Sequence, residues 1–339
     1  MDLNTIWYAL FAVLIAGYAM LDGYDLGVGV IHLFTRDEAR RRVNLNAIGP
    51  VWDGNEVWLL TGGGALFAAF PAVYATVFSG FYLALFLLLA ALIARAVSLE
   101  FRGKVDHPRW KRAWDVTFAL GSLLPAVLFG VATGNIVRGL TLNADRDYTG
   151  GFLGLLNPFS LLVGVLSLTL CVMHGAAYLT LKTEGEHRRS MATLLRHAWL
   201  AFALLYVGTS VAAAAVSPHL FERLAASPLM WAFTALLGVC LFAIPYLSAA
   251  GRFGAAFAAS SATIGLMVGL AAAGMYPYLV PSRPFAPETS LTVYNACSSP
   301  YTLGVMLVIA LIGMPLVIAY TIFIHRAFRG KVVLTPESY

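Results

Sequence analysis

The sequence predicts an all-α membrane protein that crosses the bilayer many times. Sixty per cent of its 339 residues are hydrophobic and only 12% are charged, a composition too apolar for a soluble enzyme. Long uncharged runs recur along the chain, and short polar loops separate them. Because a helix rises about 1.5 Å per residue, about 20 apolar residues span the hydrocarbon core of a bilayer. Several of these runs are long enough to do so.

Nine apolar segments are candidates for transmembrane helices. They cover residues 6–34, 54–70, 73–97, 114–137, 158–181, 197–217, 229–249, 254–278 and 303–325. The second segment is the weakest, because Gly62, Gly63 and Gly64 lower its helix propensity and Pro71 interrupts the run that follows. We therefore expect about nine helices, and an eight-helix arrangement with a re-entrant segment stays open.

The basic residues predict the orientation of these helices. Most of the 22 Lys and Arg residues lie in the segments 35–52, 98–113, 182–196, 250–253 and the tail after 325. By the positive-inside rule these segments and the C-terminus are cytoplasmic, and nine crossings then place the N-terminus outside. Arg95 lies near the end of an apolar segment, where we expect it to snorkel to the membrane surface. The net charge of +5 fits loops beside anionic lipid, and no basic stripe indicates a nucleic-acid partner.

Pairs of glycines four residues apart indicate where helices pack closely. They are Gly23 with Gly27, Gly130 with Gly134 and Gly265 with Gly269. Small residues at this spacing let two helix backbones approach each other in a membrane. We expect each pair to lie at a helix–helix contact.

Two carboxylates, Asp22 and Asp25, interrupt the otherwise uncharged run from Ile6 to Phe34. A charge in the hydrocarbon costs about 3 kcal/mol or more, so an acid there requires a reason. Three residues apart, the two side chains share one helix face. They indicate either a relay for protons or cations, or hydrogen-bonded acids that only fix helix packing.

A second polar block, Gly49–Trp58, precedes the weak second segment. It contains Asp53, Asn55 and Glu56, flanked by Trp52 and Trp58. The acids could collect protons at the cytoplasmic mouth of a helix, while the tryptophans anchor the interface. Alternatively, Asp53 or Asn55 caps the helix and the carboxylates complement its dipole.

The histidines and cysteines do not follow any metal-binding pattern. No CxxCH or HExxH sequence occurs, and no histidine pair recurs at helical spacing inside an apolar segment. His174 beside Met173 is more typical of a hydrogen-bonded core residue than of an axial haem ligand. We expect no haem, metal or disulfide in this chain.

Several long motifs resemble subunit II of the cytochrome bd-type quinol oxidases, the cyanide-insensitive type included. The motifs are Asp22–Gly29, Gly49–Trp58, Gly63–Tyr74, Phe78–Tyr82, Leu155–Phe159 and Met275–Thr292. The resemblance extends over essentially the whole chain. It implies two four-helix bundles plus a peripheral helix, which divides the chain into residues 1–138, 157–278 and a peripheral helix with its cytoplasmic tail at 303–339.

The resemblance also implies a function. Such a complex is a terminal oxidase of the bacterial cytoplasmic (inner) membrane that oxidises quinol and reduces oxygen to water. It takes the protons for water from the cytoplasm, so that turnover separates charge across the membrane. Haem b and haem d belong to the partner, subunit I. The resemblance leaves room for a structural quinone or lipid in this chain and for a small single-helix accessory subunit.

The family's site residues carry over to particular positions of this sequence. Its cytoplasmic proton-uptake groups correspond to Asp53, Glu100 and Lys104, and its intramembrane acid corresponds to Asp25. Glu100 stands where relatives can have Asp, and both side chains titrate. Trp58 corresponds to a residue that lines an oxygen approach route in some members of the family. Trp52 and Trp58 are candidates for that route or for packing beside the haems.

Two other functions are compatible with the residues. A secondary transporter also uses intramembrane acids and broken glycine-rich helices, but it predicts an internal repeat that this sequence lacks. A purely structural brace for a haem-bearing partner would use the acids for packing alone. Mutation of the acids separates a brace from a proton path.

Reporter fusions test the predicted orientation. A reporter inserted near Arg40 should read cytoplasmic and one after Arg146 external, because basic loops stay on the cytoplasmic side. An external signal near Arg40 would contradict nine crossings and move Asp53 away from the cytoplasm.

Overall fold

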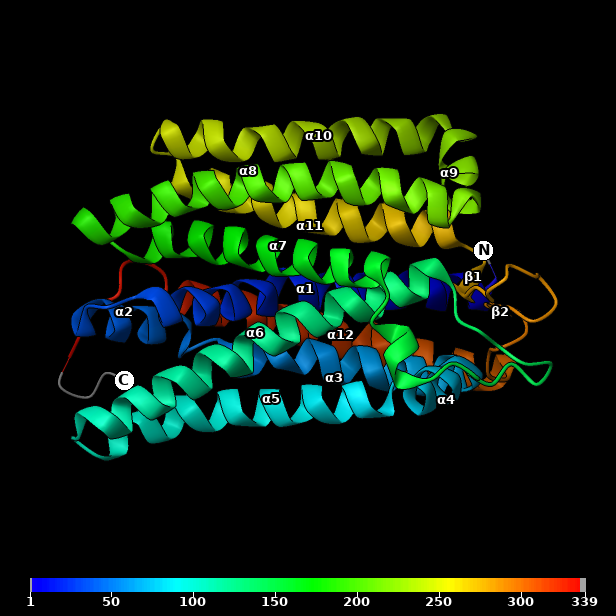
Figure 1. Cartoon of the computed structure of the whole chain (residues 1–339), viewed down its shortest axis with the longest axis horizontal. Helices are drawn as coiled ribbons and strands as arrows, with labels where there is room; N and C mark the ends of the chain where they lie inside the picture. The colour runs from blue at the N-terminus through cyan, green and yellow to red at the C-terminus, as the bar shows by residue number, and fades with distance from the viewer. Residues whose placement is uncertain (1, 336–339) are drawn as a thin grey trace.

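A computed structural model describes residues 2–335 of the chain, and α-helices make up most of it (Figure 1). The helices within this range are α1 Leu3–Phe34, α2 Glu38–Ile48, α3 Trp52–Ala69, α4 Pro71–Gly80, α5 Tyr82–Phe101, α6 Pro108–Arg138, α7 Pro158–Lys182, α8 Gly185–Val216, α9 Pro218–Ala225, α10 Pro228–Ala249, α11 Phe253–Met275 and α12 Pro300–Ala327. Short 3-10 helices lie at Arg102–Lys104 (η1) and Phe152–Leu155 (η2). Strands β1 (Tyr278–Val280) and β2 (Leu291–Thr292) pair antiparallel in the loop before α12.

The prediction of an all-α polytopic membrane protein is confirmed. Within the described residues, eight helices are long and apolar enough to cross a membrane, and the bent pair α3–α4 is a ninth candidate. In Figure 1, α2 lies at one end of the bundle and α4 at the other, so α3 carries the chain along the bundle. This course favours the ninth crossing.

The predicted segment at residues 73–97 is wrong in its boundaries. The chain bends by 120° between α3 and α4, and α5 begins only at Tyr82. Pro71 causes the first break, because proline has no N–H to donate and its ring clashes with the preceding turn, whereas at the first position of α4 it is well tolerated. The apolar run therefore forms a short helix at the end of the bundle, followed by a separate span.

Glycines bring α1, α6 and α7 into close contact. A Cβ on Gly27 would lie 1.8 Å from the carbonyl oxygen of Cys171, and one on Gly130 would lie 2.5 Å from Cβ of Ser167. Only a residue without a side chain fits at such crossings. The expectation is wrong for Gly269, which has nothing within 4 Å of its Cβ position.

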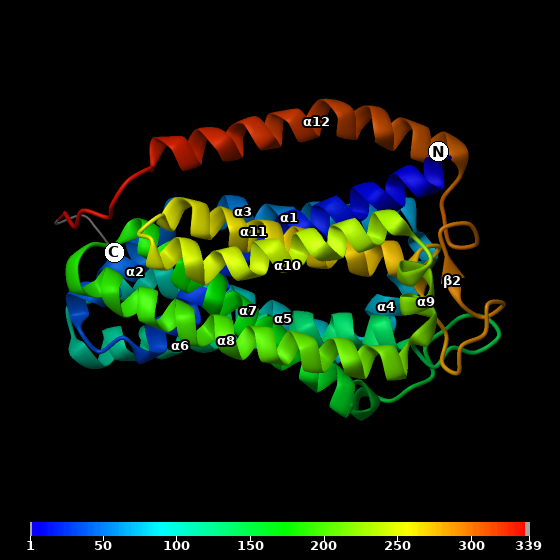
Figure 2. The ribbon, with the colours of Figure 1, turned by 90° about the horizontal axis from the view of Figure 1, so that it is seen from above.

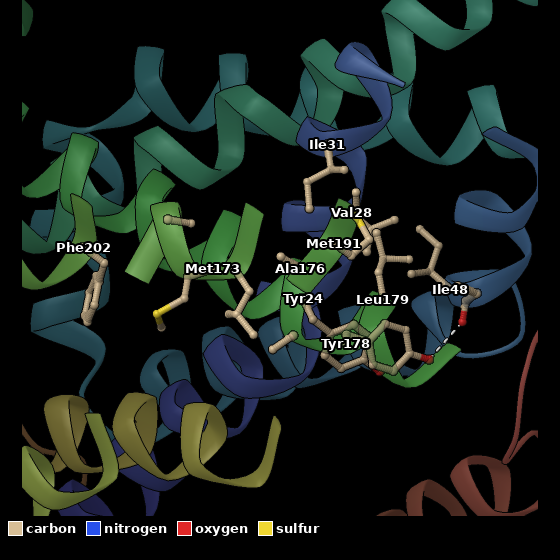
Figure 3. Packing of buried hydrophobic residues seen from close by; sticks show 14 of the residues in the cluster. Tyr24, Val28, Ile31, Ile48, Met173, Ala176, Tyr178, Leu179, Met191 and Phe202 are labelled. Carbon is tan, nitrogen blue, oxygen red and sulfur yellow. Dashed lines mark hydrogen bonds between the residues drawn. The ribbon is translucent and has the colours of Figure 1, made fainter. Parts of the chain in front are cut away.

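Helix α1 lies at the centre of the packing. It contacts α3, α6, α7, α11 and α12, while α5 packs on α6, α8 on α7 and α10 on α11. Figure 3 shows the buried cluster, in which Tyr24 of α1 lies beside Tyr178 of α7; Val28 of α1 and Met173 of α7 belong to the same cluster. Because α1 packs on α3 and α6 as well as on α7 and α11, the N-terminal and C-terminal halves of the chain share a continuous interface. The division into bundles at 1–138 and 157–278 stays a prediction.

Helix α12 lies along one face of the bundle, beside α1 and α3 (Figure 2). The structure describes this helix in full, and Leu303 at its start is its one buried residue. Its apolar side chains therefore face lipid or another chain, as expected of a peripheral helix. The tail, predicted to continue to residue 339, is described only as far as residue 335.

Substituting single glycines tests the α1–α7 contact. Gly27→Ala should lower the yield and thermal stability of the purified protein, because its methyl group overlaps the backbone of α7. Gly269→Ala is the matched control, since its methyl group meets open space. Equal melting temperatures for the two variants would show that the α1–α7 crossing is looser than described.

Candidate functional site

A buried arginine joins three helices at the centre of the site. Arg95 of α5 is 0% exposed, and its Nη2 donates to Oδ1 of Asp22 on α1 at 2.9 Å. Its Nη1 donates to Oε1 of Glu56 on α3 at 2.5 Å. The expectation that Arg95 snorkels to the surface is wrong. The guanidinium stays protonated in proteins, and the carboxylates of Asp22 and Glu56 pair with its charge away from the surface, although its Nε has no hydrogen-bond partner among the described residues.

Asp22 is held on both of its oxygens. While Oδ1 accepts from Arg95, Oδ2 accepts from the hydroxyl of Tyr18 at 2.7 Å. Asp22 is fully buried and Tyr18 nearly so. Arg95 and Tyr18 thus satisfy both oxygens of Asp22, whose charge would otherwise be costly in the membrane.

Asp25 has a different environment from Asp22. Its Oδ2 accepts from Nδ2 of Asn55 at 2.7 Å, whereas its buried Oδ1 has no hydrogen-bond partner within the described chain. Asp22 and Arg95 both lie within electrostatic range of Asp25. One guanidinium thus serves three carboxyl groups, those of Asp22, Asp25 and Glu56. Three acids around one cation leave an excess of negative charge, and Oδ1 of Asp25 is an oxygen at which a proton could be held.

The block at the start of α3 contributes to this network from the predicted cytoplasmic end. Asn55 is buried and donates to Asp25 and to the hydroxyl of Tyr24, both at 2.7 Å. Asp53 is exposed and lies one turn before Glu56, close enough for the two acidic side chains to interact electrostatically. The prediction that Asp53 or Asn55 caps α3 is wrong, because no side chain makes a capping hydrogen bond at the N-terminus of this helix. Asp53 still complements the helix dipole from the first turn.

Glu100 and Lys104 lie outside this network. Both are exposed, Glu100 near the end of α5 and Lys104 in η1. The structure places them at the predicted cytoplasmic end of the bundle, and no contact with Asp25 brings them together. Arg102 lies between them in sequence and, unlike them, is buried, with 4% of its surface exposed.

Arg102 belongs to a second ionic cluster that the sequence reasoning missed. Its Nε donates to Oδ1 of Asp115 at 2.6 Å, and its Nη2 donates to Glu38 at 2.9 Å. Nε2 of His32 lies 2.6 Å from Asp115, and Nη1 of Arg41 lies 3.3 Å away. Asp115 stands at the edge of an apolar segment, where an acid is usually solvated, so its position alone does not indicate a buried ion pair. The cluster ties the ends of α1, α2 and α6 to η1.

The two tryptophans have different environments. Trp58 is 8% exposed, and its ring leaves no room for a side chain on Gly17 of α1, whose Cβ would lie 2.3 Å from Cε3. Its indole Nε1 has no partner in the described part of the chain. Trp52 is half-buried and packs against the large cluster around Tyr24. Whether either residue adjoins an oxygen route or haem stays a prediction.

His174, the histidine in the middle of α7, does not fit as a haem ligand. Nδ1 of His174 lies 2.8 Å from Oγ of Ser260, and its Nε2 lies 2.9 Å from the carbonyl oxygen of Met20. Both ring nitrogens are therefore engaged, and Phe257 stacks on the ring at 4.8 Å. Across residues 2–335, no group of three or more His, Cys, Asp or Glu residues could hold a metal ion.

The fold and this site together define a helical membrane protein with a carboxylate–arginine network buried in its core. Comparison with known proteins identifies the family. The chain belongs to the cytochrome bd terminal oxidase subunit II family, whose model matches residues 3–328.

Relatives from several bacteria match over nearly their full length. The chain is 38% identical to cytochrome bd-I ubiquinol oxidase subunit 2 of Escherichia coli, over 97% of this chain and 95% of that protein. It is 36% identical to cytochrome bd ubiquinol oxidase subunit 2 of Bacillus subtilis, over 98% and 97% respectively. A chain of the bd oxidase from Geobacillus thermodenitrificans has a similar fold, with a TM-score of 0.76 and 20% identity over 97% of this chain and 99% of that chain.

Replacing Arg95 tests the buried network. Arg95→Gln should strongly lower the yield of monodisperse protein, because removing one partner of a buried ion pair costs about 3–5 kcal/mol. Adding Asp22→Asn should restore part of the yield, since it removes one uncompensated carboxylate. Arg112→Gln, at an exposed position, is the control. If Arg95→Gln and Arg112→Gln gave equal yields, the network would contribute little to the fold.

Proposed function

We propose that this chain is subunit II of a bd-type terminal oxidase in the bacterial inner membrane. The complex would oxidise quinol, reduce oxygen to water and separate charge across the membrane. Family membership supports this proposal, as do the two curated relatives named as subunits of ubiquinol oxidases. The C-terminus would be cytoplasmic and the N-terminus external.

The partner in this proposal is subunit I, which would carry haem b and haem d. The engaged ring nitrogens of His174 support that division, because this histidine has no nitrogen left for iron. A single-helix accessory subunit and a bound quinone or lipid remain part of the proposal. So does the arrangement of this chain in two four-helix bundles plus a peripheral helix.

The role proposed for this chain is to support subunit I and to contribute to proton uptake from the cytoplasm. The observation that carries it is the series of acids that begins at the surface and ends in the core. Asp53 is exposed, Glu56 follows one turn later and contacts Arg95, and Arg95 contacts Asp22 on the face that also holds Asp25. Glu100 and Lys104 would collect protons at the same end of the bundle. Trp52 and Trp58 would pack on the side that faces haem or an oxygen route.

The alternatives differ in what the acids do. A structural brace would use the same ion pairs for packing and would tolerate neutral amides of the same shape. A transporter would act without a haem-bearing partner, and the family match favours the oxidase.

Amide substitutions in the assembled complex test the proton path. Asp25→Asn and Asp53→Asn keep size and hydrogen bonding but cannot carry a proton. We expect quinol-driven oxygen uptake per haem to fall in each variant, and about tenfold or more in the double variant, because proton-transferring groups are worth about 10² or more in rate. Asp25→Asn should also lower assembly, because the residue is fully buried.

Asp106→Asn is the control for this experiment. Asp106 is an exposed carboxylate before α6 that pairs with Lys111 at 2.7 Å, outside the proposed route. Normalising uptake to haem content separates turnover from yield. Turnover near the wild-type value in the Asp25→Asn, Asp53→Asn double variant would leave only the brace.

A further inference from the structure

The peripheral helix α12 reaches the buried acids through one side chain. Nε2 of His325, in the last turn of α12, lies 3.0 Å from the hydroxyl of Tyr24 on α1. That hydroxyl accepts from Nδ2 of Asn55, which also donates to Oδ2 of Asp25, both at 2.7 Å. A continuous line of hydrogen bonds therefore joins α12 to the intramembrane carboxyl group.

The direction of each hydrogen bond follows from the groups involved. Nδ1 of His325 lies 2.8 Å from the carbonyl oxygen of Thr321, which can only accept, so Nδ1 carries a hydrogen. In the neutral ring Nε2 then accepts, and the Tyr24 hydroxyl must donate to it. The oxygen of Tyr24 is left to accept from Asn55. Both hydrogens of the Asn55 amide are thus used, one on Tyr24 and one on Asp25.

The surroundings hold this line in place. The Tyr24 ring stacks on Tyr178 of α7 at 4.1 Å, so its hydroxyl has little freedom to move. The end of α12 is tied to α7, because Nζ of Lys182 donates to the carbonyl oxygen of Phe328 at 2.6 Å. The backbone N–H of Val332 also donates to the carbonyl oxygen of Lys182, at 2.9 Å. These contacts present His325 to Tyr24 although most of α12 is exposed.

We propose that His325 is a positioning residue that accepts a hydrogen bond from the Tyr24 hydroxyl. Through this hydrogen bond it orients the Asn55 amide and, through the amide, Asp25. The proposal deepens the proposed function, because it makes the peripheral helix part of the support for the buried acid. Without His325, the hydroxyl proton of Tyr24 needs another acceptor. The unpartnered Oδ1 of Asp25 is a buried oxygen on the neighbouring residue that would compete for it. The hydrogen bonding of Asp25 would change although no group touching Asp25 had been altered.

The test uses the assembled complex and two measurements. Infrared difference spectra of the wild-type complex and of the Asp25→Asn variant are compared first. The carboxyl or carboxylate band that the variant lacks belongs to the Asp25 side chain. His325→Leu should shift this band and lower oxygen uptake per haem by about two- to tenfold, the range that loss of one hydrogen bond produces. His325→Gln should restore both, because its carbonyl oxygen can accept at the position of Nε2.

A double variant separates the hydrogen-bonded line from general damage to α12. Tyr24→Phe removes the hydroxyl, so adding His325→Leu to it should cause no further shift or loss of rate. His197→Leu, at an exposed position on α8, is the control for loss of a histidine. Additive effects of Tyr24→Phe and His325→Leu, or an unshifted Asp25 band in His325→Leu, would overturn the proposal. If the band shifted while Asp25→Asn left oxygen uptake unchanged, the proton path would fail and the positioning role would stand.

Discussion

The pairing of Arg95 with Asp22 and Glu56 is the interaction on which the site depends. Arg95 is fully buried, and its guanidinium is the link between α5, α1 and α3. A charge inside a membrane protein is stable only when an opposite charge and hydrogen bonds replace water. The three helices must therefore keep one relative position, and that position also brings Asn55 against Asp25.

Close backbone contact supplies the rigidity that this network requires. Gly27 of α1 and Gly175 of α7 face each other so tightly that a Cβ on Gly175 would lie 2.7 Å from the carbonyl carbon of Gly27. The crossing lies half a turn beyond Asp25 along α1, so α1 cannot rotate and carry the acid away. Stacking of Tyr24 on Tyr178 fixes the same face of α1. Acids and aromatic residues thus share one helix whose orientation is set by glycine.

The predicted cytoplasmic end contains two ionic groups with different surroundings. The Arg95 network lies in the core and has one cation for three acids, whereas Asp115 is surrounded by Arg102, Arg41 and His32. The excess of acid in the first group suits proton uptake. In the second group Glu38 also pairs with Arg102, so two carboxylates balance two guanidinium groups, which suits a fixed clamp. The clamp holds the segment that carries Glu100 and Lys104, and it leaves those two side chains exposed.

The sequence by itself determined the membrane-spanning class, the approximate helices, the break at Pro71, the intramembrane acids and the family. These features are local, because hydropathy, proline geometry and motif spacing act over a few residues. Only the tertiary structure decided the partners of the acids. Arg95 and Asp22 lie 73 positions apart, and Tyr24 and His325 lie 301 apart, so no spacing rule relates them. An isolated Arg at a helix end predicts snorkelling, and only the packing of α1, α3 and α5 gives Arg95 the carboxylates of Asp22 and Glu56 instead.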